Sequence, residues 1–255
     1  MNIVIVGAGR VGTSLSKALD RSGHNILRII SRSTEKAEKL ANVLGSGYGK
    51  DLTIPEDCEV VIVAVNDDAI HGVMKKLKAP DKTVIAHTAG SVGLEVFGSD
   101  IVNYGVFYPL QTFTDGRDFN FREIPVFIEG NNDHTSSLLR SLAASVSETV
   151  IYLISEKRKY LHLAAVFVCN FVNHMYYAGK EISGQAGMEF KVLLPLLEET
   201  MEKASDLGPE KSQTGPAVRN DKKTIEKHLD LLSFSPDLHK IYQVITDSII
   251  KKYTA

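Results

Sequence analysis

The stretch Gly7-Ala8-Gly9-Arg10-Val11-Gly12 follows an apolar run at the start of the chain and has the spacing G-x-G-x-x-G. In such a turn the first glycine permits a sharp bend, the second lets the backbone approach a diphosphate, and the third lets helix and strand pack closely. The helix that follows offers backbone N–H groups and a partial positive charge to an anion. We therefore predict that these six residues bind the diphosphate of a dinucleotide.

The residues at the end of the next expected strand help to distinguish NAD from NADP as the ligand. They read Ser31-Arg32-Ser33, and they lack the Asp or Glu that holds the ribose 2′-hydroxyl of NAD. A guanidinium flanked by hydroxyl groups suits a 2′-phosphate, because arginine makes charge-assisted, bidentate bonds to phosphate oxygens. The sequence thus favours NADP over NAD, and a surface arginine beside a helix cap is the alternative.

Two further loops follow expected strands at the edge where doubly wound sheets bind ligands. The carboxylate of Asp67 also suits a helix N-terminus, so capping is its alternative role. Small residues after His87 permit the close approach of a nicotinamide, and His87 itself is either a ligand contact or a turn residue with satisfied hydrogen bonds. The predicted cofactor contacts in these loops are Val65, Asn66, Asp67, His87, Thr88 and Ala89.

The segment from Lys159 to His174 has an apolar helical pattern that is interrupted by polar residues on one side. At about 100° per residue, these polar residues fall within a sector of about 120°. We expect the helix to be buried, so that its polar stripe meets hydrogen-bond partners, water or a ligand. The stripe consists of Lys159, His162, Asn170, Asn173 and His174.

Three residues of this stripe are candidate catalytic groups. His162 is the candidate proton donor, because histidine side chains titrate near neutrality. Asn170 would orient a substrate oxygen or the nicotinamide amide, and Lys159 is an alternative acid or an anchor for an anion. His162 and Asn170 lie about 12 Å apart along a helix, so they would line one elongated site. The alternative is that the stripe packs against polar groups of a dimer partner or of the first domain.

Four other polar residues are weaker candidates. Tyr108 and Gln111 in "FYPLQTF" would line the same site, and a core role for Tyr108 is the alternative. Arg219 and Asp221 in "GPAVRND" would pair with each other, cap the following helix, or reach a substrate carboxylate; we favour the pairing.

The elements that position these residues form two groups. Strand-like runs alternate with helical patterns up to about residue 154, as in right-handed βαβ units. We expect strands at 2–7, 25–31, 59–65, 82–88, 125–130 and 148–154, and helices at 10–22, 34–44, 67–78 and 134–146. Residues 91–121 read as irregular. Helices are expected at 156–183, 188–206, 222–232 and 236–253, with a loop at 207–221.

This order predicts an α/β Rossmann-type, doubly wound and mainly parallel sheet, followed by an all-α C-terminal domain. We place the NADP-binding domain at residues 1–154 and a helical domain for substrate and dimerisation at 155–255.

The amino-acid composition indicates which partners and which cellular compartment to expect. With 44% apolar and 24% charged residues and a formal net charge of −2, the 255-residue chain gives no reason to expect nucleic acid or a membrane as partner. Its two cysteines, Cys58 and Cys169, make neither a disulfide framework nor a metal site. They indicate a reducing compartment, and with no signal peptide we expect a cytoplasmic protein.

The glycine loop, "NDDAI", "HTAGS", "FYPLQTF", "KYLHLAAVFVCNF" and "GPAVRND" together resemble a group of NADP oxidoreductases with a Rossmann domain and a helical C-terminal domain. These are distant relatives of pyrroline-5-carboxylate reductase and of the 6-phosphogluconate and β-hydroxyacid dehydrogenases. The resemblance covers nearly the whole chain. It implies NADP binding at the loops named above, a substrate cleft between the domains, and a homodimer formed through the helical domain.

The chain departs from these relatives at the catalytic positions. β-Hydroxyacid dehydrogenases place a catalytic lysine and an asparagine one turn apart, whereas Lys159 and Asn170 are eleven residues apart. The threonine-rich helix of pyrroline-5-carboxylate reductase is also missing. Neither catalytic arrangement can be transferred.

Two functions follow from the sequence. The first is an NADP-dependent oxidoreductase that transfers hydride between the cofactor and a small carbonyl or imine substrate. The second is a non-catalytic NADP-binding sensor or scaffold that dimerises through its helical domain. A deazaflavin in place of the small substrate also stays open.

Overall fold

The computed structural model describes residues 1–254 of the chain. Its contacts divide the chain into two compact units, unit 1 from Met1 to Asn170 and unit 2 from Phe171 onward. The change from strands to helices falls earlier, because the last strand ends at Tyr152 and the next helix begins at Ser155. The functional division at residue 154 stays a prediction.

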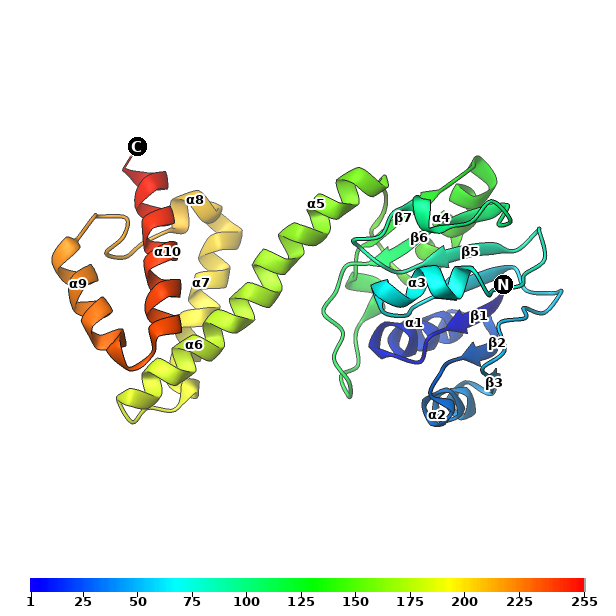
Figure 1. The fold of residues 1–255 in the computed structure, drawn as a ribbon, viewed down its shortest axis with the longest axis horizontal. Helices are drawn as coiled ribbons and strands as arrows, with labels where there is room; N and C mark the ends of the chain where they lie inside the picture. The colour runs from blue at the N-terminus through cyan, green and yellow to red at the C-terminus, as the bar shows by residue number, and fades with distance from the viewer. Residues whose placement is uncertain (255) are drawn as a thin grey trace. The chain divides into compact units, whose positions relative to one another are not determined.

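Unit 1 is built on one sheet of eight strands in the order β3-β2-β1-β4-β5-β6-β7-β8 (Figure 1). Neighbouring strands are parallel except β6 and β7, which are antiparallel. The predicted fold class is confirmed. The strands are Asn2–Val6 (β1), Asn25–Ile30 (β2), Gly47–Gly49 (β3), Val60–Val63 (β4), Val84–His87 (β5), Asn103–Pro109 (β6), Val126–Gly130 (β7) and Val150–Tyr152 (β8).

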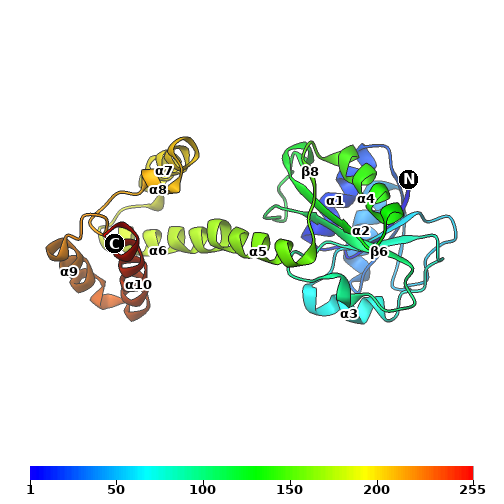
Figure 2. The same ribbon diagram turned by 90° about the horizontal axis from the view of Figure 1, so that it is seen from above.

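Helices cover both faces of this sheet. Successive residues of β1 lie on opposite faces of the sheet. Ile3 and Ile5 belong to one apolar core, and Val4 and Val6 belong to the other. Helix α3 lies on the opposite face from α1 and α4 (Figure 2). The helices of this part are Arg10–Arg21 (α1), Thr34–Leu44 (α2), Asp67–Met74 (α3) and Asp133–Val146 (α4), with short 3-10 turns at Leu94–Val96 (η1) and Phe121–Glu123 (η2).

The prediction that residues 91–121 are irregular is wrong at β6. This strand contains Gly105 and ends in Pro109, which weaken its sequence pattern. The structure accounts for the glycine, because a Cβ at Gly105 would overlap the carbonyl oxygen of Glu129 on β7. The three-residue strand β3 was also missed.

Beyond β8 the chain is helical. The predicted helix at 156–183 is interrupted by a π-helix at Val166–Phe171 (η3), which adds a residue to the turn and changes the angular positions of the residues that follow. The predicted loop 207–221 contains the short helix α8. The elements are Ser155–Ala165 (α5), Val172–Gln185 (α6), Phe190–Leu193 (η4), Leu194–Leu207 (α7), Pro209–Ser212 (α8), Lys222–Leu231 (α9), Leu232–Phe234 (η5) and Pro236–Tyr253 (α10).

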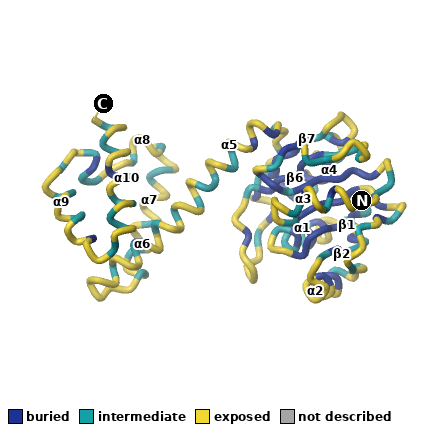
Figure 3. Tube along the Cα trace, viewed as in Figure 1, coloured by how far each residue is buried: buried dark blue, intermediate teal, exposed yellow. Residues whose placement is uncertain are grey.

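The burial of the two units differs. The strands of unit 1 are mostly buried, whereas the helices of unit 2 are mostly exposed or intermediate (Figure 3). The expectation that the helix around residues 159–174 is buried is wrong for the single chain, because Tyr160 is 77% and Val168 is 73% exposed. Most of its apolar positions are therefore not core residues of one chain; Leu161, which packs against the cluster of Val106, Tyr108 and Phe127, is an exception.

Residues 1–254 contain neither a membrane-spanning helix nor a cluster of metal-binding side chains. No helix there combines the length and apolar character that crossing a bilayer requires. Nor do three or more His, Cys, Asp or Glu side chains come together in a way that would hold a metal ion.

Candidate functional site

The glycine turn joins β1 to α1 and packs tightly on one side. A Cβ at Gly7 would overlap the carbonyl oxygen of Ala64, and a Cβ at Gly12 would overlap that of Gly7. Gly7 also has φ +121°, which disfavours a side chain. Gly9 differs from both, since a Cβ there would meet no atom within 4 Å. Close packing therefore requires glycine at positions 7 and 12, whereas Gly9 borders open space beside the turn.

The open space faces the N-terminus of α1. Gly9 is the N-cap residue, so no side chain caps this helix, and its first turn carries no acidic residue. Its first N–H groups are therefore free to bind an anion. Because β1 lies between β2 and β4, the turn stands where the direction of winding changes, which is where such sheets bind nucleotides. These features fit the diphosphate of a dinucleotide.

A cavity of about 850 Å³ extends from this turn to the ends of β2 and β3. Four cationic residues and no carboxylate line it, so it suits an anionic group. Arg32 was predicted from the sequence. The other three, Lys36, Lys50 and Lys76, were missed, because Lys36 and Lys76 belong to helical patterns and Lys50 follows the unrecognised strand β3.

The two serines beside Arg32 have structural partners. The Oγ of Ser33 accepts from the N–H of Lys36 at 3.4 Å and caps α2, and the Oγ of Ser31 accepts from the N–H of Ser33 at 3.2 Å. The guanidinium of Arg32 has no partner within residues 1–254 and lines the cavity with the lysines. The residue that caps the helix is therefore Ser33, and the side chain of Arg32 is available to bind a ligand.

A second groove of about 850 Å³ shares the glycine turn and continues past Val65 and Asn66 to Thr88 and Gln111. The two predicted contact loops come together beside it, because Ser91 donates a hydrogen bond to Asp67 at the start of α3. Arg10 and Val11 also line this groove, and the Arg10 side chain pairs with Asp115 at 3.6 Å.

His87 is fully buried in the described residues. Its Nδ1 accepts from the N–H of Ala89 at 3.2 Å, and its ring stacks on Phe97. Burial, and secondarily the charge of Arg158, lowers the pKa of His87 to about 4. His87 is thus a neutral residue that shapes the turn, and the contact role predicted for it stays a prediction.

A tyrosine–histidine pair lies against the loop after Thr88. Tyr108, at the end of β6, is nearly buried, and its Oη is 3.0 Å from Nδ1 of His162 on α5. A Cβ at Gly90 would lie 2.6 Å from His162 Nδ1 and 2.8 Å from Tyr108 Cζ, so only glycine allows the loop this close. Burial raises the pKa of Tyr108 and keeps its hydroxyl protonated. Nε2 of His162 has no partner within residues 1–254.

A buried ion pair fixes the start of α5. The guanidinium of Arg158 donates to the Glu129 carboxylate at 2.5 Å and to the carbonyl oxygen of Val92 at 2.6 Å. The same carboxylate accepts from the N–H of Ser155 at 3.0 Å. Arg158 therefore ties β7, the loop after Gly90 and α5 together around the tyrosine–histidine pair.

The remaining candidates of the polar stripe form no hydrogen bond or ion pair with Tyr108 or His162 among the described residues. Lys159 pairs with Glu95 at 3.4 Å, and both side chains are largely exposed. Asn170 is exposed in the π-helix at the end of unit 1, and Asn173 and His174 belong to unit 2. The described residues provide no hydrogen-bond partner for Asn170, and its catalytic role stays a prediction.

Arg219 and Asp221 form no ion pair within 4 Å, although the charge of Arg219 contributes to lowering the pKa of Asp221. Asp221 caps α9, because its carboxylate accepts from the N–H of Thr224 at 3.2 Å and from its hydroxyl at 2.8 Å. These hydrogen bonds lower the pKa of Asp221.

The glycine turn and the sheet define a Rossmann-type dinucleotide-binding protein, and comparisons with known proteins agree. The model of the family "NADP oxidoreductase coenzyme F420-dependent" matches residues 2–90, and that of a domain of unknown function (DUF2520) matches residues 124–249. The crystal structure of "putative NADP oxidoreductase BF3122" from Bacteroides fragilis is 38% identical, with 98% of each chain covered and a TM-score of 0.89. At this identity and coverage, the chain belongs to the same family of NADP oxidoreductases as the Bacteroides fragilis protein.

Other similarities are more distant. Protein TM1727 from Thermotoga maritima is 25% identical over 99% of this chain and 100% of that chain, with a TM-score of 0.82. A 1-pyrroline-5-carboxylate reductase from Streptococcus pyogenes shares the fold at 16% identity, with a TM-score of 0.64 and 98% of both chains covered. A glutamyl-tRNA reductase from Streptomyces coelicolor is 30% identical over 99 residues, which are 37% of this chain and only 17% of that protein.

Proposed function

We propose that the protein transfers hydride between NADP(H) and a small carbonyl or imine compound. The glycine turn and the uncapped start of α1 would hold the diphosphate. Arg32, Lys36, Lys50 and Lys76 would hold the adenosine 2′-phosphate, since they line one cavity without a carboxylate. When bound, the nicotinamide supplies or accepts the hydride.

The observation that carries the catalytic part is the hydrogen bond between Tyr108 and His162 beside Gly90. In the direction of reduction, His162 holds a proton at Nε2 and gives it to the substrate oxygen or nitrogen that gains an electron pair. The other proton stays on Nδ1, which donates a hydrogen bond to Tyr108 Oη. Tyr108 would thus fix the orientation of the ring and leave Nε2 free to act on the substrate.

The other predicted roles rest on the sequence alone. Lys159 as an anion anchor and Asn170 as an orienting amide stay predictions, as does a substrate site between the domains. The pairing of Lys159 with Glu95 gives the lysine a structural role that competes with a catalytic one.

The experiment that tests the proposal follows NADPH absorbance with oxo acids, cyclic imines, aldehydes and a deazaflavin. The deazaflavin is included because the matched family is described as dependent on coenzyme F420. We expect turnover in at least one class, and a loss of about 10² to 10⁴ in the His162→Ala variant. Tight NADPH binding with no turnover in any class would favour the sensor instead.

We also propose that the chain forms a homodimer through its helical domain in the cytoplasm. In unit 2 many large apolar side chains are exposed, among them Met201 at 69% and Leu196 at 62%. Exposed apolar surface of this extent is typical of protein interfaces. Sedimentation equilibrium should give twice the chain mass, and a monomer at high concentration would contradict this part.

A further inference from the structure

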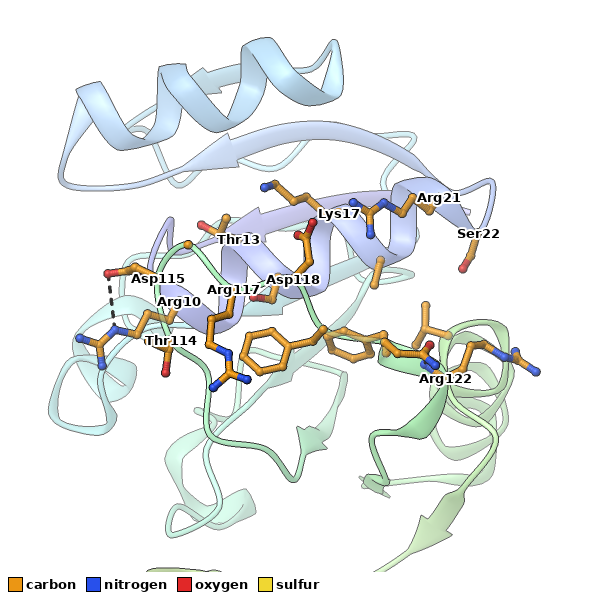
Figure 4. A pocket seen from close by; sticks show the side chains of 17 residues that line it. Arg10, Thr13, Lys17, Arg21, Ser22, Thr114, Asp115, Arg117, Asp118 and Arg122 are labelled. Carbon is orange, nitrogen blue, oxygen red and sulfur yellow. Dashed lines mark hydrogen bonds and ion pairs between the residues drawn. The ribbon is translucent and has the colours of Figure 1, made fainter. Parts of the chain in front are cut away.

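A third cavity, of about 410 Å³, lies in unit 1 between the flank of α1 and the loop that follows β6 (Figure 4). It adjoins the groove at the glycine turn, with which it shares Arg10, Thr13, Lys17 and Asp115. Lys17 and Arg21 come from the helix, and Arg117 and Asp118 come from the loop. Thr13, Lys17 and Arg21 recur every four residues, so they share one face of α1. The cavity has the size of a small-ligand site.

The charge of this cavity is strongly unbalanced. Five cationic residues line it against two carboxylates, in a chain whose formal net charge is −2. Two of the five are already paired, Arg10 with Asp115 at 3.6 Å and Arg122 with Glu148 at 3.5 Å. Figure 4 shows Arg122 directed away from α1. The three others, Lys17, Arg21 and Arg117, have no ion-pair partner within residues 1–254. One lining carboxylate, Asp118, is also unpaired there, so the cavity keeps an excess of two positive charges.

Aromatic packing holds the loop that forms the second wall. Phe113 and Phe121 are buried in the core beneath α1, and their rings stack at 5.9 Å. Phe119 packs edge-on against Phe113 at 5.3 Å. Because these rings anchor the loop on both sides of Arg117, the cavity is formed before any ligand arrives, which lowers the entropic cost of binding.

We propose that this cavity binds a small polyanion that carries at least two phosphate or carboxylate groups. Two or more negative groups are needed because the unpaired cations come from both walls. Arginine and lysine side chains make charge-assisted hydrogen bonds to either group. The site is distinct from the proposed 2′-phosphate cavity, since the two share no lining residue.

Isothermal titration with pyrophosphate and with citrate tests this proposal on the full-length protein. Titrations with saturating NADP⁺ keep the anions out of the groove at the glycine turn, and titrations without nucleotide report on the cavity even if the cofactor proposal fails. The variant combines Arg21→Glu with Arg117→Glu. The control combines Arg140→Glu with Lys82→Glu, which are exposed and lie outside the cavity. Both double variants change the net charge equally.

We expect at least one anion to bind the wild-type protein and the control with similar affinity. The Arg21/Arg117 variant should lose at least about tenfold in affinity, while its melting temperature stays close to that of the control. Pyrophosphate binding alone would indicate a phosphate ligand, and citrate binding alone a carboxylate ligand. No heat with either anion at about 10 mM would overturn the proposal. An equal loss in both double variants would overturn it too.

Discussion

Tyr108 Oη lies 3.0 Å from His162 Nδ1, although 54 residues separate them in the chain. One residue ends a central strand of the sheet and the other lies on the second turn of α5. The contact engages Nδ1, which lies beside Gly90 in the loop that follows the nucleotide groove, and it leaves Nε2 without a partner among residues 1–254. The proposed proton transfer depends on this pair.

Replacing Tyr108 by phenylalanine should lower turnover about tenfold, because the His162 ring loses the bond that orients it. NADPH binding should not change. A matched control is Tyr242→Phe in unit 2, which removes another tyrosine–histidine bond, from Tyr242 Oη to His228 Nδ1 at 2.8 Å. Steady-state kinetics on both variants separate the two effects, and equal turnover in both would remove the role of Tyr108.

Gly90→Ala should disable the same pair without touching either side chain. The added methyl group would lie 2.6 Å from His162 Nδ1, so the ring or the loop must shift. We expect turnover to fall by about 10² with little change in NADPH affinity, since displacements of this size are costly in catalysis. The control Gly98→Ala adds a methyl group with no atom within 4 Å. Wild-type activity in the Gly90 variant would show that the pair is not needed.

Glu129→Gln should destabilise unit 1 by about 3–5 kcal/mol, because it leaves the fully buried Arg158 charge without its partner. Glu148→Gln breaks an exposed pair with Arg122 and should cost less than about 1 kcal/mol. Urea unfolding measures both free energies. Replacing Glu129 and Arg158 together by methionine should recover part of the loss. If the two single variants were equally stable, the buried pair would have no structural role.

The free energy of unfolding should fall as the pH is lowered from about 6.5 to 4. Burial lowers the pKa of His87 to about 4 in the folded chain, from 6.5 for an exposed histidine. Within this range the unfolded chain binds a proton that the folded chain does not, which costs up to about 3 kcal/mol.

His87→Asn removes this titration and keeps an acceptor near the N–H of Ala89. Unfolding curves of the variant at several pH values should therefore show a weaker dependence between pH 4 and 6.5. The exposed His71→Asn serves as control. If the wild-type protein and the His87 variant had parallel pH profiles, the buried neutral state of His87 would be wrong.

Local patterns in the sequence were enough to predict most of unit 1. The glycine turn was recognised from its spacing, and the helix expected at residues 34–44 has the same bounds as α2. Strand β6 was missed because Gly105 and Pro109 obscure its pattern, and its place in the sheet depends on the neighbouring strands β5 and β7.

The site was predicted only in parts. Tyr108 and His162 were both candidates, but their pairing depends on tertiary contacts between distant segments. Lys50 and Lys76 gave no signal, because single lysines on a surface have no distinctive spacing. The rotation of about 100° per residue expected throughout residues 159–174 was also wrong. The π-helix at Val166–Phe171 interrupts the α-helical geometry there.

The most direct test of the account is a pair of calorimetric titrations, of NADPH and of NADH, into the wild-type protein and the Arg32→Ser variant. We expect the wild-type protein to bind NADPH more tightly than NADH by about tenfold or more, because the 2′-phosphate meets Arg32 and the neighbouring lysines. The variant should lose most of this preference and keep its affinity for NADH. Equal affinities of the wild-type protein for the two nucleotides, or no binding of either, would contradict the account.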